Sequence, residues 1–257
     1  MSLTFKLEAE GPYDPHPDQG YALDRWAAYR AQWGLLAAVA PMWTRPQSQP
    51  KTGLNVRHTV AMNLSAGKDN LCVNTASCED TCVTHTSWRA SSAGVQLARR
   101  VKTQFLVEYP REFAAVLAWD TERVLAQHPD AMARPNCNQD VAWEKVFPWL
   151  ADLITCYDYT KRLDRVGWLH VQYRTTYSAT SVTRPATVHR LVERGDTVTM
   201  VFPRKKHDLP SQWEGIEVVD GDVSDDRFND PAGVIVGLSW KGKLKGKAGH
   251  PLLSPVG

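Results

Sequence analysis

Apolar positions change their spacing along the chain, and each change marks an element that we expect. Residues 92–109 and 110–129 carry apolar side chains every three to four positions, which is typical of amphipathic helices. Pro110 falls in the first turn of the second helix, where a proline is tolerated. A further helix is expected over residues 183–196, in which Gly195 follows the last turn as a C-cap glycine does.

Short β-type runs alternate with these helical segments. We expect about seven strands, over residues 57–65, 130–136, 153–160, 168–178, 197–203, 216–222 and 233–241. An order of strand, helix and strand predicts a mainly parallel sheet. The pattern therefore predicts an α/β fold that is (β/α) barrel-like, and a doubly wound open sheet is the alternative.

The regular pattern begins only after an irregular start, which suggests three parts. Residues 1–56 are expected to form an N-terminal arm or cap, with one short helix over residues 22–40. Residues 57–247 are expected to form the catalytic barrel-like domain, and residues 248–257 a tail.

Composition narrows the class of protein. With 43% hydrophobic and 23% charged residues, the sequence is that of an ordinary globular protein. No apolar run approaches the roughly 20 residues that a membrane helix needs, and the acidic N-terminal stretch does not resemble a secretory signal. The formal net charge of +2 does not indicate a polyanionic partner. A basic run, either a phosphate-binding segment or a solvated tail, comprises Lys241, Lys243, Lys245 and Lys247.

Three closely spaced cysteines are the clearest chemical signal. Cys72, Cys78 and Cys82 lie within eleven residues. In a protein that is not secreted, this spacing favours metal ligation over disulfide bonds. Together with His85 they form a C-x5-C-x3-C-x2-H array, a donor set that suits tetrahedral zinc. The three cysteines alone suit a 4Fe-4S cluster with one iron left open. Buried thiols without a ligand are the third interpretation.

Polar side chains follow the second expected strand. Asn136 and Asn138 each offer a donor and an acceptor, as needed to recognise the edge of a base or a sugar. Asp140 and Glu144 are four residues apart, so on a helix they would share one face. They are candidate catalytic carboxylates, and a charge that stabilises the start of a helix is the alternative for Asp140.

A third candidate carboxylate is expected at the end of the third strand. Asp158 lies between Tyr157 and Tyr159, where its pKa can shift and where it can act as a general base or nucleophile. Lys161 and Arg162 follow and can hold a phosphate. The alternative is an aspartate that pairs with an arginine for structure.

The densest acidic segment is DGDVSDDRFND, residues 220–230, which contains Asp222. It resembles a calcium loop in spacing, but the late glutamate is absent, which excludes an EF-hand and leaves a looser divalent site. A salt-bridge hub around Arg227 is the alternative. The sequence contains no G-x-S-x-G, Walker or dinucleotide-binding motif.

Several of these motifs resemble a family of phage proteins known as the gene product 88 type. The resemblance covers roughly residues 57–247 and is carried by MNLSAGKDNLC, RPNCNQDVAWE, YDYTK, TTYS and VVDGDVSDDRFNDPAGVIVGL. It implies a phage-encoded protein in the host cytoplasm and adds no activity.

By general plan the chain is also similar to guanine transglycosylases, which are zinc-bearing barrels. Some phage relatives are thought to exchange guanine for a 7-deazaguanine in DNA and so evade restriction. This similarity implies a nucleophilic aspartate, for which Asp158 is the candidate, assisted by Asp140 and Glu144. The implied substrate-binding residues are Asn63, Asn136, Asn138, Tyr157, Lys161, Arg162 and Asp222. The group's DSGGFQ stretch is absent.

Two alternatives remain. Radical enzymes that cleave S-adenosylmethionine carry a cluster loop after the first strand, as here, although their usual spacing is C-x3-C-x2-C. A non-catalytic nucleic-acid-binding protein with structural zinc would explain the cysteines and the basic run and leave the strand-end acids unused.

Overall fold

The computed structural model describes residues 3–48, 52–65, 71–72, 92–204 and 208–240. Four of the five family motifs fall inside these ranges, namely RPNCNQDVAWE, YDYTK, TTYS and VVDGDVSDDRFNDPAGVIVGL. The candidate ligands Cys78, Cys82 and His85 and the basic run of residues 241–247 lie outside the described residues.

The described residues form one mixed sheet. Its strands are β1 (Thr59–Ala61), β2 (Met132–Arg134), β3 (Thr155–Thr160), β4 (Gly167–His170), β5 (Tyr173–Ser178), β6 (Val198–Phe202), β7 (Gln212–Trp213), β8 (Ile216–Asp220) and β9 (Ile235–Ser239). They are ordered β1-β2-β3-β5-β6-β9-β8-β7, and β4 pairs with β5 off this path.

All pairs along the path are parallel except β7 with β8, and the side pair of β4 with β5 is antiparallel as well. The predicted α/β fold with a mainly parallel sheet is therefore confirmed. Within the described part of the chain, β1 and β7 are the two edges and no pairing joins them. The sheet is open there, so closure into a barrel is not confirmed.

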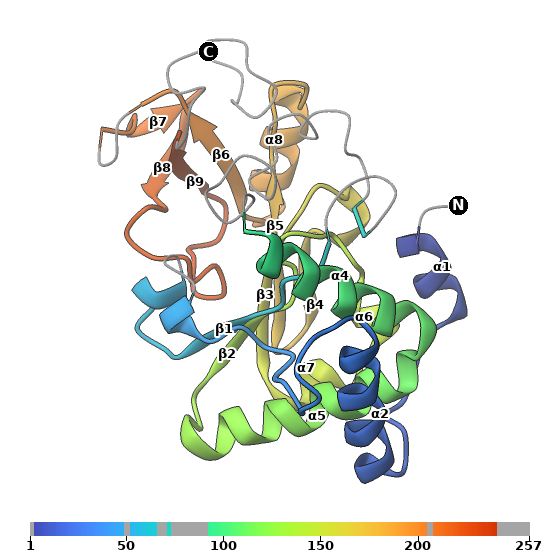
Figure 1. Ribbon diagram of the computed structural model, residues 1–257. Coiled ribbons are helices and arrows are strands. Elements are labelled where there is room, and N and C mark those ends of the chain that lie inside the picture. Colours follow the sequence, from blue (N-terminus) through green and yellow to red (C-terminus); the bar gives the residue numbers. More distant parts are fainter. Residues whose placement is uncertain (1–2, 49–51, 66–70, 73–91, 205–207, 241–257) are drawn as a thin grey trace.

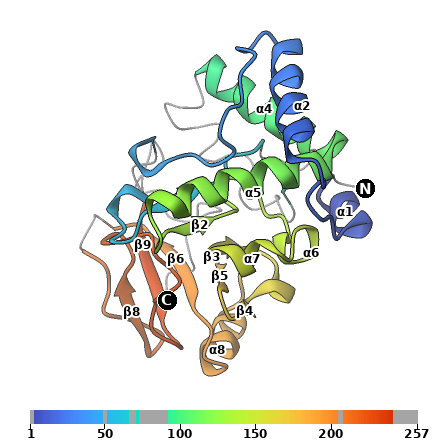
Figure 2. The ribbon, with the colours of Figure 1, turned by 90° about the horizontal axis from the view of Figure 1, so that it is seen from below.

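Two helices precede the first strand, and others connect several of the parallel strands. The helices are α1 (Leu3–Glu10), α2 (Gln19–Gln32), α4 (Ala93–Glu108), α5 (Pro110–Gln127), α6 (Trp143–Val146), α7 (Leu150–Leu153) and α8 (Pro185–Glu193), with short 3-10 turns η1 (Pro46–Ser48), η2 (Thr52–Leu54) and η6 (Leu163–Arg165). Figures 1 and 2 show α5, α7 and α8 around the outside of the strands, with α2 and α4 beyond α5. None of the described helices is long and apolar enough to cross a membrane.

The main core lies between these helices and the first strands. Phe113 of α5 and Phe105 of α4 are fully buried, as their helical spacing predicts. Trp26 of α2 packs against Phe105 with ring centroids 4.8 Å apart. Because Trp26 and Trp43 belong to the same core as Val60 of β1, the N-terminal segment is an integral layer of the fold.

Three expected elements differ from those observed. The helix expected over residues 22–40 is α2, which ends at Gln32 because Gly34 adopts the left-handed conformation (φ 73°) that terminates helices. The strand expected over residues 168–178 is a β4–β5 hairpin that turns at the exposed Val171. The first expected strand shrinks to three residues, and α1 has no counterpart among the predictions.

Candidate functional site

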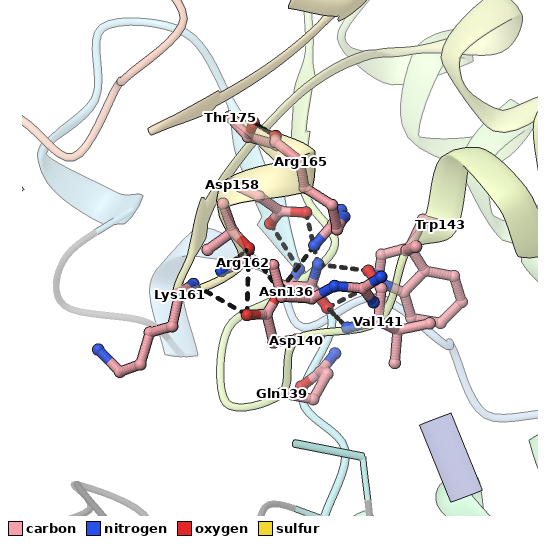
Figure 3. A network of polar contacts seen from close by, with 12 residues as sticks. Asn136, Gln139, Asp140, Val141, Trp143, Asp158, Lys161, Arg162, Arg165 and Thr175 are labelled. Atoms are coloured by element: carbon pink, nitrogen blue, oxygen red, sulfur yellow. Dashed lines mark hydrogen bonds and ion pairs between the residues drawn. The ribbon is translucent and has the colours of Figure 1, made fainter. Parts of the chain in front are cut away.

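A buried polar network lies on the helix-covered side of β3 (Figure 3). Asp158 is 0% exposed, and its carboxylate accepts hydrogen bonds from the Asn136 backbone N–H (2.6 Å), from Asn136 Nδ2 (2.8 Å) and from the Tyr173 hydroxyl. Two of these three donors belong to the loop that follows β2. The carboxylate therefore fastens that loop to the sheet.

The Asn136 side chain also forms hydrogen bonds within the same loop. Its Nδ2 donates to the Val141 carbonyl at 2.9 Å, and its Oδ1 accepts from the Val141 N–H (3.0 Å) and from Trp143 Nε1 (2.9 Å). Every polar atom of the Asn136 side chain is thus used inside the protein. In this geometry the Asn136 side chain stabilises the loop, and the substrate contact predicted from the sequence stays a prediction.

Arg165 joins the two predicted carboxylates beside this loop. It lies 2.7 Å from Asp140 and forms a two-pronged contact with Glu144, with both N–O distances 2.9 Å. Asp140 also accepts from the backbone N–H of Lys161 at 3.0 Å and from the Thr160 hydroxyl. Asp140 precedes α6 and does not lie on a helix with Glu144, contrary to the prediction, yet the arginine brings both together.

Arg162 extends the network to the N-terminal helix. Its guanidinium lies 2.6 Å from Glu8 of α1 and 3.0 Å from Asp164. Glu8 in turn accepts from the Ala142 N–H at 2.9 Å. Through these contacts α1 is held against the loops that follow β2 and β3.

The catalytic role predicted for Asp158 requires that a substrate can reach it. A nucleophile or general base has to reach the reacting atom of a substrate. Asp158 lies within β3 rather than at its end as predicted, and it has no exposed surface. Its contacts are those of a residue that positions the loop after β2.

The pKa of the Asp158 carboxyl provides a test of its burial within β3. Burial raises its pKa to about 7, against the opposing effects of Arg165, the Tyr173 hydroxyl and Asn136. The folded state thus keeps a proton that the unfolded state releases near its ordinary pKa of 3.8. The stability contributed by this proton is fully present below that value and is lost as the pH rises through about 7.

We therefore expect the stability difference between the wild type and Asp158→Asn to change with pH, because the amide does not titrate. Urea unfolding of both proteins from about pH 4 to about pH 8 is the measurement. The wild type is expected to lose stability relative to the variant across this range. A difference that stays constant would contradict the raised pKa.

The carboxyl ends of the parallel strands gather a second set of predicted residues. Asn138 Nδ2 donates to Asn63 Oδ1 at 2.7 Å, and Asn63 Nδ2 donates to the Thr44 hydroxyl at 3.0 Å. The thiol of Cys72, which is partly buried, lies 3.5 Å from the Asn138 carbonyl oxygen. The cysteine-bearing segment therefore starts at the carboxyl edge of β1 and β2.

A pocket of about 430 Å³ opens at the carboxyl ends of β3 and β5. Lys161 and Arg162 line it, and Lys161 Nζ donates to Ser178 Oγ at 3.1 Å. The lining also includes the acidic Asp164, which lies 3.0 Å from Arg162, and neutral residues such as Tyr177 and Thr183. The structure thus places the two predicted cations at a pocket.

Two predicted binding residues lie elsewhere. Tyr157 is buried on the face of β3 opposite Asp158, and its hydroxyl contacts Asn55 and Asp225. Asp222 accepts from the Ser239 N–H at 2.9 Å and from the Ser239 hydroxyl, which ties the segment after β8 to β9. Both have structural contacts, and neither joins the residues at the carboxyl ends of β1 and β2.

Asp225 is the residue that the sequence-based reasoning missed. It lies 2.7 Å from Arg134 of β2 and accepts from the Tyr159 hydroxyl at 3.0 Å. The segment after β8 therefore covers the face of the sheet that the helices leave open. The tyrosines on either side of Asp158 were the available signal, because alternate residues of a strand point to opposite faces.

The described residues bear only partly on a metal site. Among them, no three His, Cys, Asp or Glu side chains gather in a way that could hold a metal ion. Of the predicted ligands only Cys72 is described, so neither the zinc nor the iron–sulfur prediction is decided by this geometry.

The family model described as Gene product 88 matches residues 34–250. No curated protein and no solved structure was found to match the chain.

Proposed function

The chain belongs to the gene product 88 family, and we propose, from its cysteine segment rather than from the family, that it is an iron–sulfur enzyme that uses S-adenosylmethionine for radical chemistry on nucleic acid. One observation carries the proposal: Cys72 follows β1 at the carboxyl edge of an open, mainly parallel sheet. Ligands of such sheets bind outside the carboxyl ends of the strands.

The donor set fits the proposed group. Cys72, Cys78 and Cys82 would supply three thiolates, in a C-x5-C-x3-C spacing that differs from the usual C-x3-C-x2-C, and would leave one iron of a 4Fe-4S cluster open to a substrate ligand. When bound, the cluster supplies the electron for reductive cleavage of S-adenosylmethionine. Zinc held by the same cysteines and His85 is the competing ligand.

The residues of the chain have definable tasks in this proposal. Asn138 and Asn63 hold the start of the cysteine segment against the ends of β1 and β2. Asp158 and Arg165 fix the loop that carries Asn138, so that this position is reproducible. Rigid support of this kind is what a reactive site needs around its binding groups.

Nucleic acid is the proposed substrate class because cationic side chains line two pockets at the carboxyl ends of the strands, although Arg162 also pairs with Glu8 and Asp164. Lys161 and Arg162 line the pocket at β3 and β5, and Arg99 and Lys102 line another near β1. Lysine and arginine side chains are the usual partners of phosphate groups.

The base-exchange reaction predicted from the sequence has less support from the geometry. It needs a nucleophile that reaches the sugar, and the candidate Asp158 is fully enclosed. Mass spectrometry of nucleosides from DNA of cells that produce the protein tests this alternative, which predicts a 7-deazaguanine.

The test of the iron–sulfur proposal is anaerobic purification followed by metal analysis and an absorption spectrum. We expect a brown protein with roughly four iron atoms per chain and consumption of S-adenosylmethionine when a reductant is added. Cys72→Ser is expected to lose most of the iron.

The matched control is Cys156→Ser. Cys156 lies within β3, fully buried, with its thiol 3.3 Å from the Ile154 carbonyl oxygen. This variant should retain the iron of the wild type. A colourless protein with one zinc, or equal iron loss in both variants, would overturn the proposal.

A further inference from the structure

A second pocket, of about 490 Å³, is connected to the cysteine position through Asn63, which lines it, and Asn138, which contacts both Asn63 and Cys72. It lies at the carboxyl end of β1, between α4 and the segment that comprises Thr44 and η1. Its lining consists of Thr44, Gln47, Ser48, Asn63, Val95, Ala98, Arg99 and Lys102. None of these side chains is acidic.

One face of α4 forms the cationic wall. The four lining residues of α4 share one side of the helix. Val95, Ala98 and Lys102 are three or four residues apart, and Arg99 follows Ala98 directly. Lys102 Nζ donates to the Met42 carbonyl at 2.7 Å, which fixes the ammonium group at the pocket.

The charge at Lys102 lacks a close counter-ion among the described residues. No described carboxylate lies within 4.0 Å of its Nζ, and the nearby Asp120 is engaged with Arg45 at 2.8 Å. Burial, together with Arg30 and Arg99, lowers the pKa of Lys102 to about 8. The amine is therefore still mainly protonated at neutral pH, and a partly buried charge of this kind favours an anionic partner.

The opposite wall supplies neutral hydrogen-bonding groups on a fixed backbone. Thr44 and Ala61 exchange both backbone hydrogen bonds, at 2.8 and 3.0 Å, which attaches this wall to β1. Asn63 contacts Thr44 on this side and Asn138 on the other. Because Asn138 also contacts Cys72, the pocket and the cysteine position share one chain of contacts.

We propose that this pocket binds a phosphate group of the substrate, with Lys102 as its principal cation. A volume of about 490 Å³ has room for a nucleoside phosphate and not only for a bare anion. The link to catalysis rests on the proposed function, whereas binding itself does not require turnover.

Calorimetric titration of the full-length protein as purified tests the phosphate site. The probes are a single-stranded oligonucleotide with a 5′-phosphate, a nucleoside monophosphate and the corresponding nucleoside. We expect both phosphorylated probes to bind, and we expect no binding of the nucleoside. Binding of the oligonucleotide alone would assign the phosphate to a strand, and equal binding of both would assign it to a single nucleotide.

Lys102→Met keeps the length of the side chain and removes its charge, and we expect about tenfold weaker binding. Lys145→Met is the matched control, because Lys145 is exposed on α6 and lines neither pocket. Its binding should equal that of the wild type.

Ala98→Asp provides a second variant that leaves Lys102 in place and adds a negative charge to the lining. It is expected to weaken binding at least as much, with an unchanged melting temperature showing that the fold is intact. Wild-type binding of the nucleoside as tight as that of its phosphate, or unchanged binding in both variants, would overturn the proposal. Iron content is measured separately, so failure of the iron–sulfur proposal would be seen independently.

Discussion

Replacing Arg165 by leucine is expected to lower the free energy of unfolding by about 3–5 kcal/mol. Arg165 is 1% exposed and is the shared partner of Asp140 and Glu144. Without the guanidinium, two carboxylates that are mostly shielded from water would lie side by side with no cation between them. Loss of one partner from a buried ion pair is costly for this reason.

Chemical denaturation of the wild type and of Arg165→Leu measures the effect. The matched control is Arg194→Leu, since Arg194 pairs with Asp196 but its side chain is 57% exposed. An exposed ion pair contributes about 1 kcal/mol or less. Similar losses in the two variants would mean that the Arg165 network is not a main support of the fold.

A comparable loss, again about 3–5 kcal/mol, is expected for Asp225→Leu. Asp225 is 4% exposed, and it neutralises Arg134 beneath the segment that follows β8. Its backbone N–H also donates to Asn55 Oδ1 at 2.8 Å, so three separate parts of the chain meet at this residue. Removing the carboxylate leaves the Arg134 guanidinium buried without its principal counter-charge.

The double variant Arg134→Met/Asp225→Leu separates charge from packing. With both charges absent, no uncompensated ion remains, so the double variant should lose less stability than the sum of the two single variants. Denaturation curves of the four proteins give the coupling energy. Additive losses would show that Asp225 acts through packing alone.

Local sequence patterns were sufficient for much of the fold. The helices expected at residues 92–109 and 110–129 are α4 and α5, because their apolar spacing is a property of the helix itself. The alternation of strands and helices was also sufficient to predict a mainly parallel sheet. Strand lengths and the β4–β5 hairpin were not predictable in the same way, because pairing partners decide where a strand ends.

In the candidate site, too, local features could be predicted from the sequence, whereas the roles of the residues could not. The spacing of Cys72, Cys78 and Cys82 is a local feature, and from it the sequence alone predicted ligand chemistry on the segment after the first strand. The polar character of Asn136, Asp140 and Asp158 was equally visible, but their roles were not. A residue type shows what a side chain can do, whereas its surroundings decide what it can reach.

The cysteine spacing, the two long helices and the parallel sheet were thus determined by the sequence itself. Only the tertiary structure decided that Asp158 faces the helices while Tyr157 and Tyr159 face Asp225. Alternation along a strand separates two faces but does not say which one is covered. The ion pairs depend on the same information, because Arg165 and Asp140 are 25 residues apart and Arg134 and Asp225 are 91 apart. Contacts over such separations arise from the packing of whole elements and leave no periodic signal in the chain.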